Sequence, residues 1–410
     1  MNLKLLVLIV LAVIFLYEQM LELVDRGVRP LPDSVKDVYD AQTYAKWKEY
    51  HLALNRLNLW RNTVSFVVNY LVLALDGYAA FAALFGCSEF MQLLAVVLLM
   101  SLTDLATLPL SWVETMKIEE KYGFNRSTAK TFWADQMKSF VISFLLMAGI
   151  AALLMGLHHA LGDWLILAFA GALMVFMLLI SFLFPYLSRV FNKFTPLEDG
   201  ELKTALTALL EKHGYRVHAI QVMDASRRTT KSNAYFTGFG NLKTIVLYDT
   251  LIQNMSNEEI CAVFAHEMGH GLHRDTLKMR VLSFLGLLMM AVLAWFTVKT
   301  PGLFTVFGFA GINYGFALLL IFSVEFALLS PLTGLYTNAF SRRAEYRADT
   351  QAVEEGYGDA LISALKKLCR ENFSDLSPNP VLVKLTYSHP PLADRLAAIE
   401  NAMKQEGKKC

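Results

Sequence analysis

The sequence predicts an all-α, polytopic membrane protein with seven transmembrane helices. Hydrophobic residues make up 55% of the 410 residues and charged residues only 18%, whereas about a quarter of the residues in a typical soluble protein are charged. The apolar excess is concentrated in runs that can cross about 30 Å of hydrocarbon as helices. Polar segments separate these runs, and one of them carries an H-E-x-x-H motif.

The first apolar run covers residues 1–24. A cleaved signal peptide is the alternative, but no A-x-A-like cleavage site follows the run, so a retained membrane helix is favoured. The other six predicted spans are residues 63–86, 91–113, 139–157, 164–187, 281–298 and 316–340.

The spans divide the chain into four predicted segments. Residues 1–190 form an N-terminal membrane region with five helices and two cytoplasmic loops, and residues 191–280 form a cytoplasmic segment with the H-E-x-x-H motif. Residues 281–340 carry the sixth and seventh helices, and residues 341–410 form a C-terminal segment that completes the site.

The charges of the loops predict the topology. The connectors after spans one, three and five are rich in Lys and Arg. The other loops, residues 87–90, 158–163 and 299–315, together contain a single Lys or Arg residue, Lys299. Basic loops stay in the cytoplasm. We therefore expect the N-terminus outside, and the H-E-x-x-H motif and the C-terminus inside. The 37 Lys and Arg residues nearly equal the 36 Asp and Glu residues, so no basic excess points to a nucleic-acid partner.

Three acidic residues, Asp76, Asp104 and Glu325, interrupt the predicted spans. A charge inside a membrane is costly unless it faces protein or water. These residues either pair with one another or with basic side chains, or they line a wetted cavity.

The H-E-x-x-H motif consists of His266, Glu267 and His270. Residues four apart lie on one face of a helix, so both imidazoles can reach a single Zn²⁺. Glu267 is placed to hold and deprotonate a water on the metal. The pattern predicts one zinc ion per chain.

A zinc site needs a third protein ligand. His273 and Asp275 are close in sequence, but residue 276 is not a histidine, so the longer H-E-x-x-H-x-x-G-x-x-H pattern is absent. Glu345 and Asp349 share a helix face beyond the seventh span; one could bind zinc while the other accepts a hydrogen bond from a ligand imidazole. The alternative is a solvated helix with paired charges.

Two further segments carry candidate substrate contacts. Residues 232–240 and 243–248 flank a Gly-Asn turn signal and predict a β-hairpin, whose edge strand can bind an extended peptide or can be purely structural. His389 and Arg395 can stabilise an oxyanion or bind a carboxylate, although their stretch also fits an ordinary helix start after two prolines.

Taken together, these motifs resemble those of the type I CaaX prenyl proteases, a family of integral membrane zinc metallopeptidases. The resemblance rests on VYDA at 38–41, KYGFN at 121–125, SNAY at 232–235, the H-E-x-x-H motif with Glu345 and Asp349, and SHPPL at 388–392. It implies a hollow barrel of seven helices, and a mainly helical, zincin-like catalytic domain that carries the small β-hairpin.

The resemblance also implies residue roles. Glu345 corresponds to the third zinc ligand and Asp349 to the partner of a ligand histidine. Asn233 corresponds to a contact to the substrate backbone. His389 corresponds to the residue that stabilises the transition state, and Arg395 to one that fixes the site or binds substrate.

We therefore expect a zinc endopeptidase that acts on peptide or protein substrates, prenylated or not, in contact with membrane lipid. It would lie in the inner membrane of a bacterium, or in the endoplasmic reticulum or inner nuclear membrane of a eukaryote. Two alternatives are a quality-control protease of the shorter heat-shock membrane type and a non-enzymatic scaffold with a structural zinc. The sequence leads to no expectation of oligomeric state.

Overall fold

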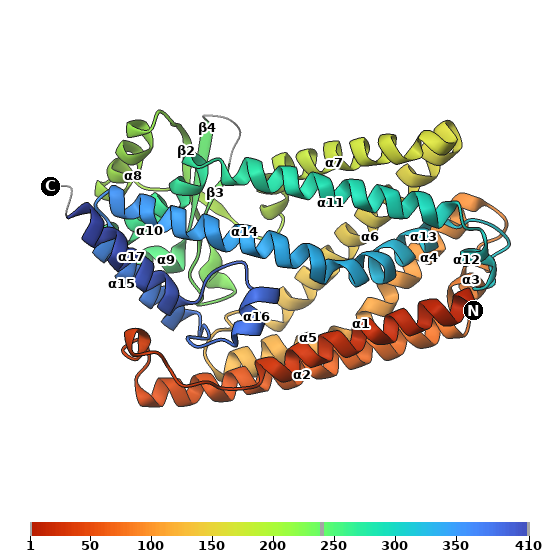
Figure 1. The fold of residues 1–410 in the computed structure, drawn as a ribbon, viewed down its shortest axis with the longest axis horizontal. Coiled ribbons are helices and arrows are strands. Elements are labelled where there is room, and N and C mark those ends of the chain that lie inside the picture. Colours follow the sequence, from red (N-terminus) through yellow and green to blue (C-terminus); the bar gives the residue numbers. More distant parts are fainter. Residues whose placement is uncertain (1, 238–241, 408–410) are drawn as a thin grey trace.

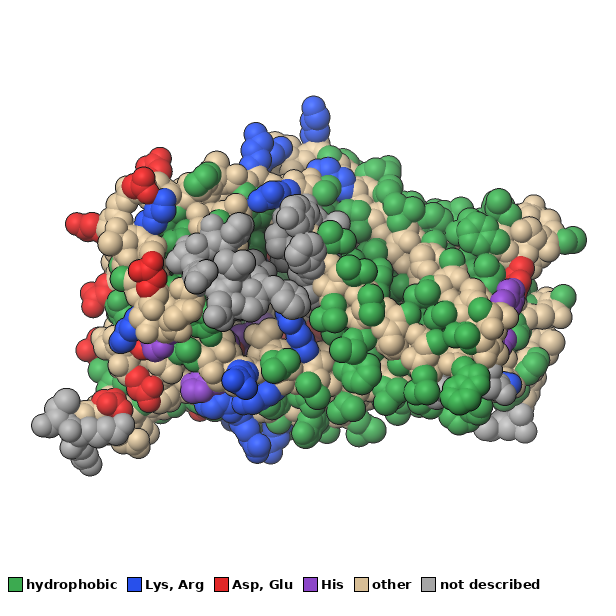
Figure 2. Space-filling view, turned by 90° about the horizontal axis from the view of Figure 1, so that it is seen from above, with side chains coloured by type: hydrophobic (Ala, Val, Ile, Leu, Met, Phe, Trp, Pro, Cys, Tyr) green, Lys and Arg blue, Asp and Glu red, His purple; other side chains and the backbone are tan. Residues whose placement is uncertain are grey.

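A computed structural model describes residues 2–237 and 242–407. Long helices form one end of the molecule, and shorter helices with a small sheet form the other (Figure 1). Hydrophobic side chains cover much of the visible face over the long helices, whereas most charged side chains lie toward the opposite end (Figure 2). The long-helix part consists of α1 (Leu3–Asp25), α2 (Ala41–Ala74), α3 (Gly77–Ala83), α4 (Glu89–Asp104), α5 (Leu108–Val113), α6 (Ala129–Leu161), α7 (Leu165–Ser188), α11 (Asp275–Val298), α12 (Gly302–Thr305), α13 (Tyr314–Leu320) and α14 (Ala327–Glu354).

The predicted polytopic membrane fold is confirmed by several helices of membrane length. Within the described residues, five helices are long and apolar enough to cross a membrane, or six if the bent pair α2–α3 counts as one span. The segments Glu89–Glu119 and Tyr314–Glu354 each count as one continuous helix among the five. Helix α7 has a shorter described apolar stretch, Leu167–Ile180. The count of seven, and the hollow barrel, therefore stay predictions.

Helix α2 begins at Ala41, about six helical turns before residue 63, where the apolar pattern alone places its start. It starts at Ala41, inside the segment interpreted as a polar connector, because Asp40 caps it by accepting a hydrogen bond from the backbone N–H of Thr43. Trp47 and Tyr50 on this polar part are buried. The early turns of α2 are therefore packed against protein, and the membrane part follows without a break.

Two of the three intramembrane acids have partners in the structure. Asp76 has a left-handed backbone (φ 56°) at the 63° bend between α2 and α3, and one of its carboxylate oxygens lies 2.7 Å from Lys4 Nζ. Glu325 accepts a hydrogen bond of 2.7 Å from the hydroxyl of Thr297. Asp104 ends α4 and is exposed. Pairing with a basic side chain thus holds for Asp76.

The shorter elements build the other end of the molecule around a four-stranded sheet. The strand order is β1-β2-β4-β3, with β2 parallel to β4 and β3 antiparallel to β4. These elements are β1 (Phe194–Pro196), β2 (Arg216–Met223), β3 (Ala234–Thr237), β4 (Leu242–Tyr248), α8 (Glu201–Lys212), α9 (Asp249–Asn254), α10 (Asn257–Leu272), α15 (Gly358–Glu371), α16 (Pro380–Leu385) and α17 (Leu392–Glu406).

The predicted hairpin is confirmed in its two strands, which pair from Ala234 with Leu247 to Thr237 with Thr244. Its turn, Gly240-Asn241, lies outside the described residues. The sequence interpretation missed β1 and β2. Parallel pairing of β2 with β4 joins segments that no short turn connects, so it leaves no local turn signal in the sequence.

The larger hydrophobic core of the sheet end includes residues from three distant segments. Val35 and Trp47 from the first connector, Phe264 from α10 and Leu396 from α17 belong to this core. The Tyr39 hydroxyl lies 2.9 Å from the carbonyl oxygens of both Cys369 and Ser374, which share its one proton. Chain segments more than 300 residues apart thus meet at this end of the molecule. The predicted division of the chain at residues 190, 280 and 340 stays a prediction.

Candidate metal centre

The H-E-x-x-H motif lies on the C-terminal half of α10. This helix begins with a capping box in which Ser256 Oγ accepts from the backbone N–H of Glu259, and the Glu259 carboxylate accepts from the backbone N–H of Ser256. Reciprocal bonds of this kind satisfy two N–H groups that a helix start leaves free. The next seven residues are buried. Capping and burial therefore fix the helix that carries both histidines.

Helix α10 crosses α14 at Gly269, which lies inside the motif. A Cβ at Gly269 would stand 2.9 Å from Ala348 Cα and 3.0 Å from Gln351 Cβ. Only glycine permits so close an approach of the two backbones. The crossing brings Glu345 of α14 opposite the two histidines of α10.

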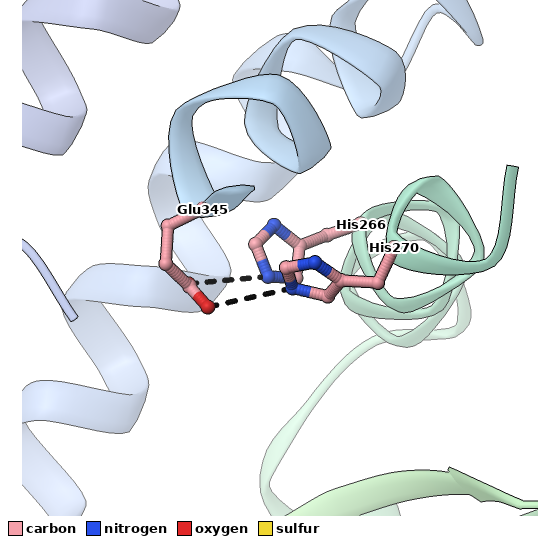
Figure 3. A group of neighbouring side chains, drawn as sticks. All are labelled: His266, His270 and Glu345. Carbon is pink, nitrogen blue, oxygen red and sulfur yellow. Dashed lines mark ion pairs between the residues drawn. The ribbon is translucent and has the colours of Figure 1, made fainter. Parts of the chain in front are cut away.

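The two imidazoles turn the same nitrogen toward one carboxylate, as Figure 3 shows. His266 Nε2 lies 3.4 Å from Glu345 Oε2, and His270 Nε2 lies 3.4 Å from Glu345 Oε1. One ligand atom from each of the three residues lies within 4.8 Å of the others. The structure thus brings together the three residues expected to hold a metal, although 75 residues of sequence separate His270 from Glu345.

Asp349 and Arg395 hold His266 from the other side. Asp349 Oδ1 lies 2.8 Å from His266 Nδ1 and accepts a hydrogen bond of 2.6 Å from Arg395 Nη2. Burial alone lowers the pKa of His266, but the carboxylates of Asp349 and Glu345 beside the ring outweigh burial and raise this pKa to about 9. A proton on the imidazole must leave before the ring binds a cation, so metal binding releases a proton here.

The donor set fits a metal ion. The buried atom Glu345 Oε2 accepts no hydrogen bond from any described residue, although His389 Nδ1 lies 2.9 Å away. A buried carboxylate oxygen left in this state is unfavourable unless a cation completes it. Two imidazole nitrogens and one carboxylate are the protein ligands of one kind of catalytic zinc site, which keeps its fourth position open.

A cavity of about 100 Å³ opens beside these ligands. Asn233 and Ala234 at the start of β3, with Glu267, form part of its lining. The apolar part of the lining consists of Leu251, Val263, Leu361, Leu365 and Leu368. The cavity thus joins an edge strand, the metal ligands and an apolar wall.

The structure gives the two candidates of the C-terminal segment different surroundings. His389 is 65% exposed at the cavity and faces Glu345, whereas Arg395 is buried and bonded to Asp349. The geometry of Arg395 therefore favours fixing the site over binding substrate. His273 ends α10 and is not one of the three grouped ligands.

Sequence reasoning missed two features of the site. Leu361, Leu365 and Leu368 follow i, i+4, i+7 spacing on α15, which signals an apolar face but not what that face covers. Asp275, considered as a ligand, instead approaches His270 Nδ1.

Two histidines and a glutamate, grouped beside a cavity in a chain that also has several apolar helices of membrane length, indicate a membrane metalloendopeptidase. The sequence comparisons agree with this class. A family model described as CAAX prenyl protease N-terminal, five membrane helices, matches residues 20–193, and the model of peptidase family M48 matches residues 196–403. The chain belongs to peptidase family M48 and has the N-terminal membrane region of the CAAX prenyl proteases.

Individual relatives support the assignment over most of the chain. The CAAX prenyl protease 1 homolog of Mus musculus is 30% identical over 91% of this chain and 89% of its own length. The homolog of Arabidopsis thaliana is 36% identical over 75% of this chain and 72% of its own length. The crystal structure of S. mikatae Ste24p superposes with a TM-score of 0.87 at 30% identity and covers 97% of this chain and 99% of the solved chain.

The resemblance inferred from the sequence motifs is therefore confirmed. Membership of a peptidase family supports an enzyme and leaves a non-enzymatic scaffold without support. The match to the five-helix N-terminal region favours the CAAX prenyl protease kind over the shorter heat-shock type.

Proposed function

We propose that this membrane metalloendopeptidase uses zinc to hydrolyse peptide bonds near the C-terminus of CaaX-type or other membrane-associated substrates. The observation that carries the proposal is the convergence of His266, His270 and Glu345 at one wall of the cavity that Glu267 also lines. The donor set is the one that zinc peptidases use, with a position left for water.

The residues of the chain take separate roles in this proposal. His266, His270 and Glu345 would hold zinc, which when bound supplies a Lewis acid that lowers the pKa of a water. Glu267 accepts the proton of the attacking water and returns it to the leaving amine.

Substrate and oxyanion contacts come from outside the motif. His389 donates a hydrogen bond to the developing oxyanion. Asn233, next to the edge strand β3, binds the backbone of an extended peptide. Asp349 and Arg395 keep His266 oriented.

The cavity and the relatives support the proposed substrate class. The leucines of α15 and Val263 offer an apolar surface beside Glu267, so the residue next to the scissile bond is expected to be apolar. Proteins named CAAX prenyl protease 1 are similar over most of this chain, which supports a C-terminal CaaX tail as substrate. The partners are a peptide or protein, prenylated or not, and membrane lipid.

The active site is proposed to face the cytoplasm. The basic connectors predict this side, and many Lys and Arg side chains visible in Figure 2 lie between the apolar half and the sheet end. The membrane would be the inner membrane in a bacterium, or the endoplasmic reticulum or inner nuclear membrane in a eukaryote.

Glu267→Gln tests the mechanism. The variant keeps the size of the side chain but cannot accept the proton, so we expect it to retain zinc and lose peptide cleavage by a factor of at least about 10². Metal analysis and cleavage of a quenched peptide, with and without chelator, measure both properties. A variant that cleaves as fast as the parent would show that Glu267 is not the base.

A second measurement addresses the substrate. Cleavage of a farnesylated CaaX peptide is compared with cleavage of its unmodified twin by the parent protein in detergent. A higher kcat/KM for the farnesylated peptide supports a prenyl-dependent activity. Equal values would show that the enzyme recognises the peptide and not the farnesyl group.

A further inference from the structure

A carboxylate meets each ligand imidazole on the side that faces away from Glu345. For His266 this group is Asp349, at 2.8 Å from Nδ1. For His270 it is Asp275, whose Oδ2 lies 3.4 Å from Nδ1. A hydrogen bond from Nδ1–H to a carboxylate keeps the proton on Nδ1 and leaves the lone pair of Nε2 for a metal.

Each of the two carboxylates is also held by a guanidinium group. Arg395 Nη2 donates to Asp349 at 2.6 Å, and Arg347 Nη2 donates to Asp275 Oδ1 at 2.6 Å. Asp275 is only 3% exposed, and its two oxygens are divided between Arg347 and His270. The His270 side of the centre therefore repeats the imidazole–carboxylate–guanidinium arrangement of the His266 side.

The pair of Asp275 and Arg347 also connects two membrane helices. Asp275 is the first residue of α11, and Arg274 before it turns the chain with a left-handed backbone (φ 55°). Arg347 lies on α14, two residues after Glu345. The ion pair therefore joins the start of one membrane helix to the end of another at the level of the metal ligands.

We propose that Asp275, held by Arg347, is a positioning residue that fixes the tautomer and orientation of His270 for metal binding. The inference rests on the proposed function, because the atom that Asp275 presents is a zinc ligand there. This role of Asp275 makes the affinity for zinc depend on how α11 and α14 pack against each other.

An ion pair between two helices is the competing explanation for the same contacts. A purely structural pair affects folding stability, and the affinity for zinc stays as it was. The affinity of the folded protein for zinc therefore separates the two roles.

The test compares Asp275→Asn with Asp135→Asn in the full-length protein in detergent. Asp135 accepts hydrogen bonds of 2.9 and 3.3 Å from Arg228, so the control also removes the charge of an Arg-bound carboxylate, and neither residue lines the metal cavity. The zinc dissociation constant is measured by competition with a chromophoric chelator. Thermal melting of the zinc-free proteins measures the structural effect of each variant.

We expect Asp275→Asn to weaken zinc binding by about 10- to 100-fold, the usual effect of losing such a partner, and Asp135→Asn to leave it within twofold of the parent. Arg347→Met keeps the carboxylate and is expected to weaken zinc binding less than Asp275→Asn does. If Asp275→Asn does not fold, the zinc affinity of Arg347→Met is compared with that of the parent instead.

Affinities within twofold of the parent for the folded variants would overturn the role of Asp275 while leaving the zinc site intact. A parent protein that binds no zinc would instead overturn the proposed function, and this inference with it.

Discussion

Gly269 and Ala348 meet where α10 crosses α14, and a Cβ on Gly269 would stand 2.9 Å from Ala348 Cα. The obstacle is backbone, which cannot move aside as the end of a flexible side chain can. The crossing sets the distance between the helix that carries His266 and His270 and the helix that carries Glu345. A glycine inside the H-E-x-x-H motif therefore determines the geometry of the metal centre.

Gly269→Ala is expected to separate the two helices. Overpacking of this kind costs about 1–3 kcal/mol of stability, and the ligands move apart, so we expect at least a tenfold loss of zinc affinity as well. Chelator competition and thermal melting measure the two effects. Gly286→Ala on α11 is the control, because a Cβ at Gly286 meets no atom within 4 Å. Equal zinc affinity in both variants would contradict the packing argument.

Zinc removal is expected to destabilise the protein. A ligand that binds only the folded state adds about 2.7 kcal/mol at a concentration 100-fold above its dissociation constant. Chelator should therefore lower the melting temperature of the parent and of Glu267→Gln, but not that of Glu345→Gln. A shift of the same size in Glu345→Gln would mean that Glu345 is not a ligand.

Glu259 makes the stability of the catalytic domain dependent on pH. Burial alone raises the pKa of Glu259, but the hydrogen bonds from Lys367, Ser363 and the backbone of Ser256 outweigh burial and lower this pKa. A carboxyl with a lowered folded-state pKa stabilises the fold above its ordinary pKa of 4.5, and the stabilisation is lost as the pH falls through the folded-state value.

Glu259→Gln is accordingly expected to destabilise the protein by about 1.5–3 kcal/mol at pH 7, because a neutral amide then replaces the charged acceptor of these hydrogen bonds. The difference from the parent should shrink as the pH falls below 4.5. Melting temperatures at pH 7 and pH 4 measure this, and Glu258→Gln on the exposed side of α10 is the matched control. A difference that does not change with pH would contradict the assignment.

The contact between Lys4 and Asp76 is expected to stabilise the bend between α2 and α3. Loss of Lys4 leaves a half-buried carboxylate without its partner, so Lys4→Met should cost about 1–3 kcal/mol. Asp76→Asn in addition should restore part of that stability. Lys36→Met, which breaks an exposed pair with Asp33, is the control and should cost less than about 1 kcal/mol. Additive effects of the first two substitutions would show that the pair is not coupled.

Local patterns predicted the elements that local interactions build. The hydrophobic runs predicted the membrane helices, and the aromatic and β-branched residues around Gly240-Asn241 predicted β3 and β4. The start of α2 and the strands β1 and β2 could not be predicted in the same way. Trp47 and Tyr50 are buried by distant segments, and β2 pairs with a strand that no short turn joins to it.

The sequence by itself determined the apolar helices, the metal-ligand spacing of His266 and His270, and the short set of candidates for the third ligand. These follow from spacing and polarity within one element, which depend on the helical repeat alone. Only the tertiary structure decided that Glu345 faces both Nε2 atoms while Asp275 and Asp349 meet the Nδ1 atoms. Such choices depend on how α10, α11 and α14 pack, and packing is set by contacts between residues far apart in the chain.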